Sequence, residues 1–145
     1  LAEQLKDHTI TRKYHAIVHG VLKEDNGTID APIGRHPVER KKMSVNYKHG
    51  KHAVTHYRVL KRFEKFTYVE CQLETGRTHQ IRVHMASIRH PLLGDAIYGP
   101  AKSPMKLQGQ TLHAKILGII HPRTSQYMEF NAELPDYFKH LLEIL

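Results

Sequence analysis

An α+β fold is predicted by this sequence, with a mostly antiparallel mixed sheet flanked by short helices. Segments of strand length with alternating apolar residues follow one another across short turns, which favours antiparallel pairing. Two segments, 79–88 and 135–145, instead carry apolar residues at helical spacing. With 145 residues and 40% hydrophobic content, the chain is large enough for about one domain with a single core.

The first third of the chain predicts a helix end followed by a hairpin. Residues 1–7 carry two leucines one helical turn apart and no initiator Met, so we expect the end of a helix in a piece of a longer protein. Residues 10–20 alternate apolar side chains and end at a glycine, which predicts a strand. The Asn26-Gly27 pair predicts a hairpin turn, after which residues 28–33 return as the second strand.

Residues 34–43 contain four closely spaced cations and too little apolar periodicity to form a packed element. We expect a basic loop here, and both a solvated charge run and a phosphate contact fit this composition. A turn at 48–51 then precedes a second hairpin, formed by residues 53–63 and 66–73. The cations of the basic loop are Arg35, Arg40, Lys41 and Lys42.

A short helix is expected over residues 79–88, with Ile81, Met85 and Ile88 as its apolar stripe and Thr78 as its N-cap. The residues after it are rich in Gly and Pro and predict an ordered loop. The remaining expected elements are this loop at 90–99 and 100–109, two strands at 112–120 and 127–132 around a turn at 121–125, and a closing helix at 135–145.

Lys and Arg outnumber Asp and Glu by 22 to 14, which gives a formal net charge of +8 and a pI of about 9.6. Such a chain attracts polyanions through phosphate neutralisation, so RNA or DNA is expected as a partner ahead of an anionic membrane surface. No apolar run approaches the roughly 20 residues of a membrane span, and nothing resembles a signal peptide. The lone Cys71 can form neither an internal disulfide nor a thiolate metal site, so we expect a cytoplasmic protein without redox chemistry.

The most informative segment begins where Gly76 breaks a strand and a helix starts with Arg77, His79, Gln80 and Arg82 in or beside its first turn. Backbone N–H groups at a helix start, together with two guanidinium groups, form a site for an anion. That anion is either a phosphate of a nucleic acid or a carboxylate of the protein itself. Both alternatives remain open from the residues alone.

No metal and no nucleotide cofactor are expected. His79 and His84 are five residues apart instead of the four that place two ligands on one helix face, and no acidic residue lies between them. Neither a Walker motif nor a dinucleotide fingerprint occurs in the sequence.

Several segments together resemble the RluA/RluD-type pseudouridine synthases, which modify ribosomal RNA. The most specific is residues 73–84, which read LETGRTHQIRVH. The resemblance implies a cofactor-free isomerisation of uridine to pseudouridine in large-subunit ribosomal RNA, with the target base first flipped out of its stack. The other matching segments are RKY at 12–14, AVTHY at 53–57, HPLLGD at 90–95 with YG at 98–99, and LHA at 112–114 with HP at 121–122.

The resemblance also implies roles for individual residues. Tyr14 matches the family tyrosine that stacks on the flipped base, and Arg82 matches the arginine that pairs with the catalytic aspartate. An arginine suits that role because a nearby cation keeps a carboxylate ionised. Substrate or RNA contacts are further implied for Arg77, His79, Gln80 and Leu112, and for the basic-loop residues Arg35, Arg40, Lys41 and Lys42.

The catalytic aspartate itself is not expected here, because the family carries it in a His-Arg-Leu-Asp motif that this sequence lacks. Residues 1–145 are therefore expected to be the later part of a pseudouridine synthase catalytic domain, inactive alone. Two other functions fit the composition: a non-catalytic RNA-binding module, and a nuclease that uses paired histidines as acid and base. A His-Arg-Leu-Asp motif just before Leu1 would favour the synthase, its absence the binding module, and RNA strand scission by the chain the nuclease.

Overall fold

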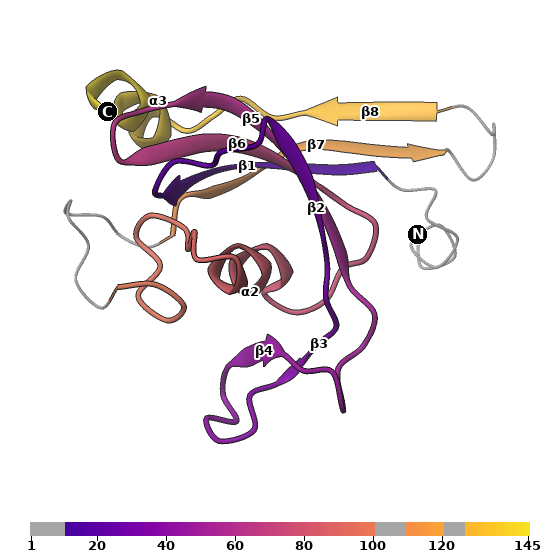
Figure 1. Ribbon diagram of the computed structural model, residues 1–145. Helices are drawn as coiled ribbons and strands as arrows, with labels where there is room; N and C mark the ends of the chain where they lie inside the picture. Colours follow the sequence, from indigo (N-terminus) through magenta and orange to yellow (C-terminus); the bar gives the residue numbers. More distant parts are fainter. Residues whose placement is uncertain (1–10, 101–109, 121–126) are drawn as a thin grey trace.

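The computed structural model describes residues 11–100, 110–120 and 127–145. A six-stranded sheet has the order β2-β5-β6-β1-β7-β8, and each printed pairing in it is antiparallel. Helix α2 lies against one face of this sheet and helix α3 against the other (Figure 1), so the predicted α+β fold is confirmed. The bounds are β1 Thr11–His19, β2 Asn26–Asp30, β3 Ile33–Arg35, β4 Met43–Val45, β5 Val54–Arg62, β6 Phe66–Leu73, α2 Gln80–Ser87, β7 Leu112–Ile120, β8 Tyr127–Asn131 and α3 Asp136–Ile144.

Strand β1 is the centre of the sheet, because β6 pairs along one edge of it and β7 along the other. Its alternating side chains serve two separate clusters. Ala16 and Val18 are fully buried in the cluster that contains Ile81 and Met85 of α2. Ile17, between them, packs with residues of α3. The predicted strand is therefore confirmed, and the apparent interruption by Ile17 serves the second helix.

The predicted first hairpin is wrong. The Asn26-Gly27 pair does not form a turn but begins β2, which pairs with β5, so that Gly27 lies opposite Tyr57. Strand β2 has no place beside β1, since both edges of β1 are occupied. A Cβ at Gly27 would come within 2.6 Å of the Tyr57 ring. The glycine thus permits close packing of a neighbouring aromatic ring and does not supply turn geometry. The second predicted hairpin, β5 with β6, is confirmed.

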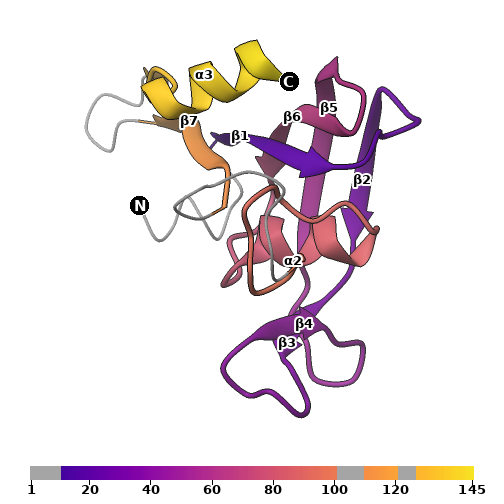
Figure 2. The same ribbon diagram turned by 90° about the vertical axis from the view of Figure 1, so that its left-hand side faces the viewer.

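Residues 34–43 are also more ordered than predicted. Strands β3 and β4 pair antiparallel, with Ile33 opposite Val45 and Arg35 opposite Met43, and the basic loop is only the connection between them. This small sheet lies on the side of α2 away from the large sheet (Figures 1 and 2). Val83 of α2 packs with Ile33 in the cluster beneath the helix, so α2 is held between two sheets.

Helix α2 keeps its predicted apolar stripe but not its predicted cap. Ile81 and Met85 are buried and Ile88 is packed against them. Thr78 is not the N-cap: His79 occupies that position with a left-handed φ of 54°, and no side chain caps the helix. Helix α3 begins directly after Pro135, close to the predicted start. The predicted helix end at 1–7, the turn at 121–125 and residues 101–109 of the predicted loop lie outside the described residues.

Candidate active site

A buried ion pair joins Arg82 of α2 to Asp95 in the loop that follows the helix. Arg82 donates from Nε to Oδ2 at 2.8 Å and from Nη2 to Oδ1 at 3.0 Å. The two side chains are 10% and 0% exposed. The Arg82 guanidinium also lies over the ring of Tyr98, 5.0 Å from its centroid. Two parallel hydrogen bonds and an aromatic face together fix the plane of the guanidinium group.

Asp95 is equally well held. Its Oδ1 accepts hydrogen bonds from the backbone N–H groups of Ile97 and Tyr98 at 3.1 and 3.2 Å. Burial alone raises the pKa of Asp95, but the hydrogen bonds from Arg82, Tyr98 and Ile97 outweigh it, so the pKa lies below its ordinary value. The carboxylate is therefore ionised at neutral pH.

Asp95 was not among the predicted site residues, and the predicted pairing of Arg82 with a catalytic aspartate stays a prediction. Arg82 was expected to pair with a carboxylate from outside the chain, whereas within the described residues it pairs with Asp95. A guanidinium carries five N–H donors, and Asp95 accepts from two nitrogens only, so the edge formed by Nη1 and the second Nη2 hydrogen is not used by this pair. The signal for Asp95 was present in the HPLLGD segment at 90–95, which matches the family motifs but in which no residue had a predicted role.

Gln80 does not lie where an RNA phosphate could reach it, because its side chain is 3% exposed. Its amide nitrogen donates to Val54 O at 2.9 Å and to Thr55 Oγ1 at 3.0 Å. Its amide oxygen accepts from Thr75 Oγ1 at 2.7 Å and from the backbone N–H of Arg77 at 3.0 Å. The expected substrate contact is therefore corrected: the side chain joins the start of α2 to β5 and to the preceding loop.

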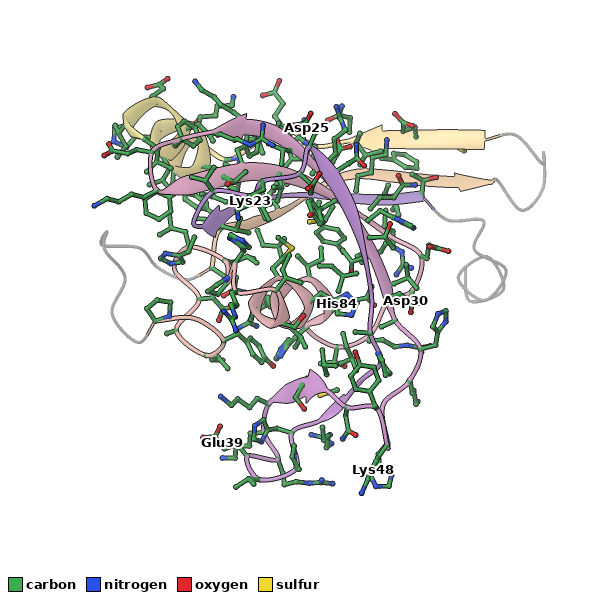
Figure 3. All side chains as sticks on the ribbon, viewed as in Figure 1. Lys23, Asp25, Asp30, Glu39, Lys48 and His84 are labelled. Carbon is green, nitrogen blue, oxygen red and sulfur yellow. The ribbon has the colours of Figure 1, made fainter. Side chains whose placement is uncertain are left out.

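His84, one turn further along α2, extends the same network. The imidazole is fully buried, and its two nitrogens lie 2.8 Å from Thr55 Oγ1 and 2.8 Å from Ala31 O. Figure 3 shows its side chain extending from α2 toward β2. Burial lowers the pKa of His84, opposed by the bond to Ala31 O, so the ring is neutral and structural.

His79 and Arg77 lie at the start of α2 and are partly exposed. His79 Nδ1 is 2.7 Å from the hydroxyl of Tyr98, and this hydroxyl accepts a bond from the backbone N–H of Met43 at 3.0 Å. Tyr98 thus links the helix start to β4. Arg77 donates from Nε to His52 O at 2.8 Å, which holds its side chain along the loop beside β5.

Tyr14 and Leu112 lie on the face of the large sheet that carries α2. Both are partly buried and pack against the cluster that includes Ile81 and Met85. Leu112 stands opposite Ala16 on the neighbouring strand. Among the described residues, no hydrogen bond, ion pair or ring contact joins Tyr14 to Arg82. Tyr14 packs against α2 from the sheet, whereas Arg82 belongs to α2 and is paired with Asp95 in the loop that follows the helix.

The basic loop is a folded turn, not a random charge run. His36 Nδ1 accepts from the backbone N–H groups of Val38 and Glu39 at 3.2 and 3.0 Å. Arg35 Nη1 donates to Arg40 O at 3.0 Å, and the Lys42 ammonium lies 2.9 Å from the Glu39 carboxylate. Figure 3 shows Glu39 at the end of the molecule away from the large sheet. The turn holds Arg40 and Lys41 exposed on its surface.

Two open hollows lie beside this loop and share Lys42 and Ile97. The larger, about 550 Å³, is lined by Glu39, Arg40, Lys41, Lys42, Ala96 and Ile97. The second, about 460 Å³, lies between β4, α2 and the loop 97–99. Its wall includes Ser44, whose buried Oγ has no hydrogen-bond partner. The lysine and arginine side chains that line the larger hollow suit an anionic ligand.

The described residues contain no group of three or more His, Cys, Asp or Glu side chains arranged to hold a metal ion. None of the described helices has the length and apolar character needed to cross a membrane.

Comparisons of sequence and fold identify one class of protein. A family model described as RNA pseudouridylate synthase matches residues 1–87, and the chain belongs to this family. An RNA pseudouridine synthase of Bacillus subtilis, YlyB, is 57% identical over the whole chain, which covers 47% of that relative. The ribosomal large subunit pseudouridine synthase D of Pseudomonas aeruginosa is 48% identical over the whole chain, which covers 48% of that relative.

Solved structures agree with the sequence relatives. The human RNA pseudouridylate synthase domain containing 1 superposes with a TM-score of 0.79 at 29% identity, over 92% of this chain and 58% of that chain. The human domain containing 4 gives a TM-score of 0.78 at 26% identity, over 98% of this chain and 64% of that one. The chain spans about half the length of the curated relatives that it matches.

Proposed function

We propose that residues 1–145 are the later part of the catalytic domain of an RNA pseudouridine synthase, a cytoplasmic enzyme that isomerises uridine to pseudouridine in large-subunit ribosomal RNA. Membership of the family and relatives named for large-subunit ribosomal RNA support this assignment. In the reaction the C–N glycosidic bond of the target uridine breaks, the uracil turns, and a C–C bond forms, without cofactor or metal. The net positive charge of +8 suits an RNA partner.

The observation that carries the proposal is the fixed guanidinium of Arg82. Asp95 and the Tyr98 ring hold its plane, and the edge that Asp95 leaves free is suited to a second carboxylate. In the proposed enzyme that carboxylate is the catalytic aspartate, supplied by a part of the protein outside this sequence. Arg82 would keep it ionised and aimed at the sugar.

Tyr14 and Leu112 are proposed to receive the flipped uracil. They lie on one face of neighbouring strands beside α2, so an aromatic face and an apolar side chain are available from the same side. Stacking on a tyrosine ring stabilises an extruded base without reading its sequence. Tyr14 would therefore contact the base and Leu112 would form an apolar wall.

The basic loop and the start of α2 are proposed to bind the RNA backbone. The loop is held by its own hydrogen bonds, so Arg40 and Lys41 are presented with little additional ordering on binding, beside Arg35 and Lys42. Arg77 and His79 lie partly exposed at the helix start, where Arg77 adds a cation and His79 a hydrogen-bonding group. Such contacts supply affinity and position more than sequence selection.

The test is isomerisation by the full-length protein. Incubating it with uridine-containing large-subunit ribosomal RNA and mapping pseudouridine by mass or by chemical modification should give a product at a defined position. The matched control is the present chain alone, which should bind the RNA and produce no pseudouridine. Full-length protein that forms no pseudouridine in any large-subunit substrate would rule the proposal out.

A non-catalytic RNA-binding module is the second candidate, because the net charge of +8 and the exposed basic loop suit RNA binding without chemistry. The residues preceding Leu1 in the protein distinguish the two functions. A His-Arg-Leu-Asp segment there supports the enzyme, and its absence supports the binding module.

A further inference from the structure

Arg12 is a partly buried cation for which the described residues supply no partner. Its Nε is buried and has no hydrogen-bond partner, and none of the ion pairs among the described residues includes it. Leaving the Nε–H group of a cation buried without an acceptor costs free energy. A side chain in this condition points to an anion that binds there.

The chain makes room for this guanidinium with Gly76. Nη1 of Arg12 lies 2.3 Å from the position that a Cβ at Gly76 would occupy, so any other residue there would displace the side chain. Gly76 belongs to the loop that leads into α2 and is itself exposed. Packing therefore explains the glycine of the TGRTHQ segment. Because Gly76 has no side chain, the guanidinium of Arg12 can lie against this loop at a place that solvent can reach.

Arg12 lies next to the proposed base-stacking residue. It precedes Tyr14 by two positions on β1, and alternation along the strand places both on the face that carries α2. The electrostatic neighbours agree: burial lowers the pKa of Arg12, opposed by the nearby Tyr14, and no carboxylate of the described residues contributes. A nucleotide stacked on Tyr14 would bring its own phosphates to this side of the sheet.

We propose that Arg12 binds a backbone phosphate immediately next to the target uridine, in a seat formed with Gly76. The proposal rests on the proposed function and deepens it by naming the phosphate contact closest to the flipped base. Phosphate is favoured over a protein carboxylate because Gly76 leaves the guanidinium against an exposed loop, and because the planar guanidinium matches phosphate oxygens in pairs. Arg12 is a binding residue here and takes no part in bond breaking.

The first experiment compares Arg12→Gln with Lys13→Gln in the full-length protein. Both remove one positive charge from β1, but Lys13 is on the opposite face, where it lines a hollow with Arg58 and Glu70. Arg12→Gln should weaken binding of substrate RNA by about tenfold or more and reduce the slope of log K against log salt by roughly 0.7 to 0.9. Lys13→Gln should change neither quantity substantially.

The second experiment places a single uncharged methylphosphonate at each phosphate flanking the target uridine. One of these substitutions should weaken binding of the unchanged protein about as much as Arg12→Gln does, and should cause no further loss in that variant. Gly76→Ala should behave like Arg12→Gln, because it displaces the same guanidinium. Coupling between one phosphate and Arg12 supports the seat even if the variants are also less stable without RNA.

The proposal is wrong if Arg12→Gln binds RNA with unchanged affinity and salt slope, and equally if no flanking phosphate couples to it. A lower thermal midpoint together with unchanged RNA affinity would identify a carboxylate elsewhere in the protein as the partner. If the full-length protein binds no RNA at all, the proposed function itself is wrong. This result differs from RNA binding that is unaffected by Arg12→Gln, which contradicts only the role of Arg12.

Discussion

Replacing Arg82 with alanine should destabilise the protein as well as inactivate it. Asp95 is 0% exposed and would lose the Arg82 bonds at 2.8 and 3.0 Å, keeping only the backbone bonds from Ile97 and Tyr98. Removing one partner of a buried pair costs about 3 to 5 kcal/mol. Because two hydrogen bonds to Asp95 remain, we expect a loss near the lower limit, about 3 kcal/mol in the free energy of unfolding at pH 7.

Urea unfolding of the full-length protein measures this loss. The matched variant is Arg82→Ala with Asp95→Asn, which removes the stranded charge and keeps the acceptor for Ile97 and Tyr98. This double variant should recover part of the stability lost in Arg82→Ala. A loss below about 1 kcal/mol for Arg82→Ala, the size expected of an exposed pair, would refute a buried pair.

The pH dependence of the same loss has a definite sign. The folded pKa of Asp95 is lowered, so the stability that the pair contributes is present above the unfolded pKa of about 3.9 and is lost as pH falls through the folded pKa. The difference between the unchanged protein and Arg82→Ala should therefore shrink below about pH 4. A difference that stays constant down to the acid-unfolding limit would contradict the assignment.

The catalytic effect is separable from the structural one. If Arg82 orients a catalytic carboxylate and makes no phosphate contact, Arg82→Ala should abolish pseudouridine formation at a temperature where the variant is folded, and its affinity for RNA should remain nearly unchanged. Parallel loss of affinity and turnover would instead place Arg82 in the RNA-binding surface.

Three further predictions concern other parts of the site. Replacing Lys41 and Lys42 together by Gln should weaken RNA binding for all sequences and flatten its salt dependence, whereas an unchanged slope would leave the loop merely solvated. Gln80→Leu should lower the free energy of unfolding by about 1 to 3 kcal/mol in urea, because it strands buried hydrogen-bonding partners, and a neutral effect would contradict the network. Burial lowers the pKa of His84, so the stability that its neutral ring contributes is lost as pH falls below about 6.5. His84→Gln should therefore make the free energy of unfolding less dependent on pH between about pH 5 and 7. An unchanged pH profile in this variant would contradict the assignment.

Local patterns determined the elements that the structure confirms. The alternation in β1, the hairpin of β5 and β6, and the stripe of Ile81 and Met85 depend on the two-residue and 3.6-residue periods of strands and helices. These periods are written in neighbouring residues. The motifs likewise indicated the family, because a specific string such as GRTHQIR is a property of the chain itself.

Predictions from local patterns were wrong where the same short segment is compatible with two different structures. Asn26-Gly27 is a strong turn signal, yet the occupied edges of β1 placed it in β2 opposite Arg58 and Tyr57. Gln80 looked available at the start of a helix, but β5 and the loop before α2 take the hydrogen bonds of its side chain. In both cases the side chain or dipeptide allows either state, and a neighbour that is distant in sequence decides between them.

The sequence by itself determined the secondary structure near its motifs, the family and the residue types of the site. Only the tertiary structure decided which groups meet: Arg82 with Asp95, thirteen positions away, and the guanidinium of Arg12 against Gly76. The physical reason is that periodicity depends on backbone geometry over a few residues. Ion pairing and steric room depend instead on which segments the folded core brings together.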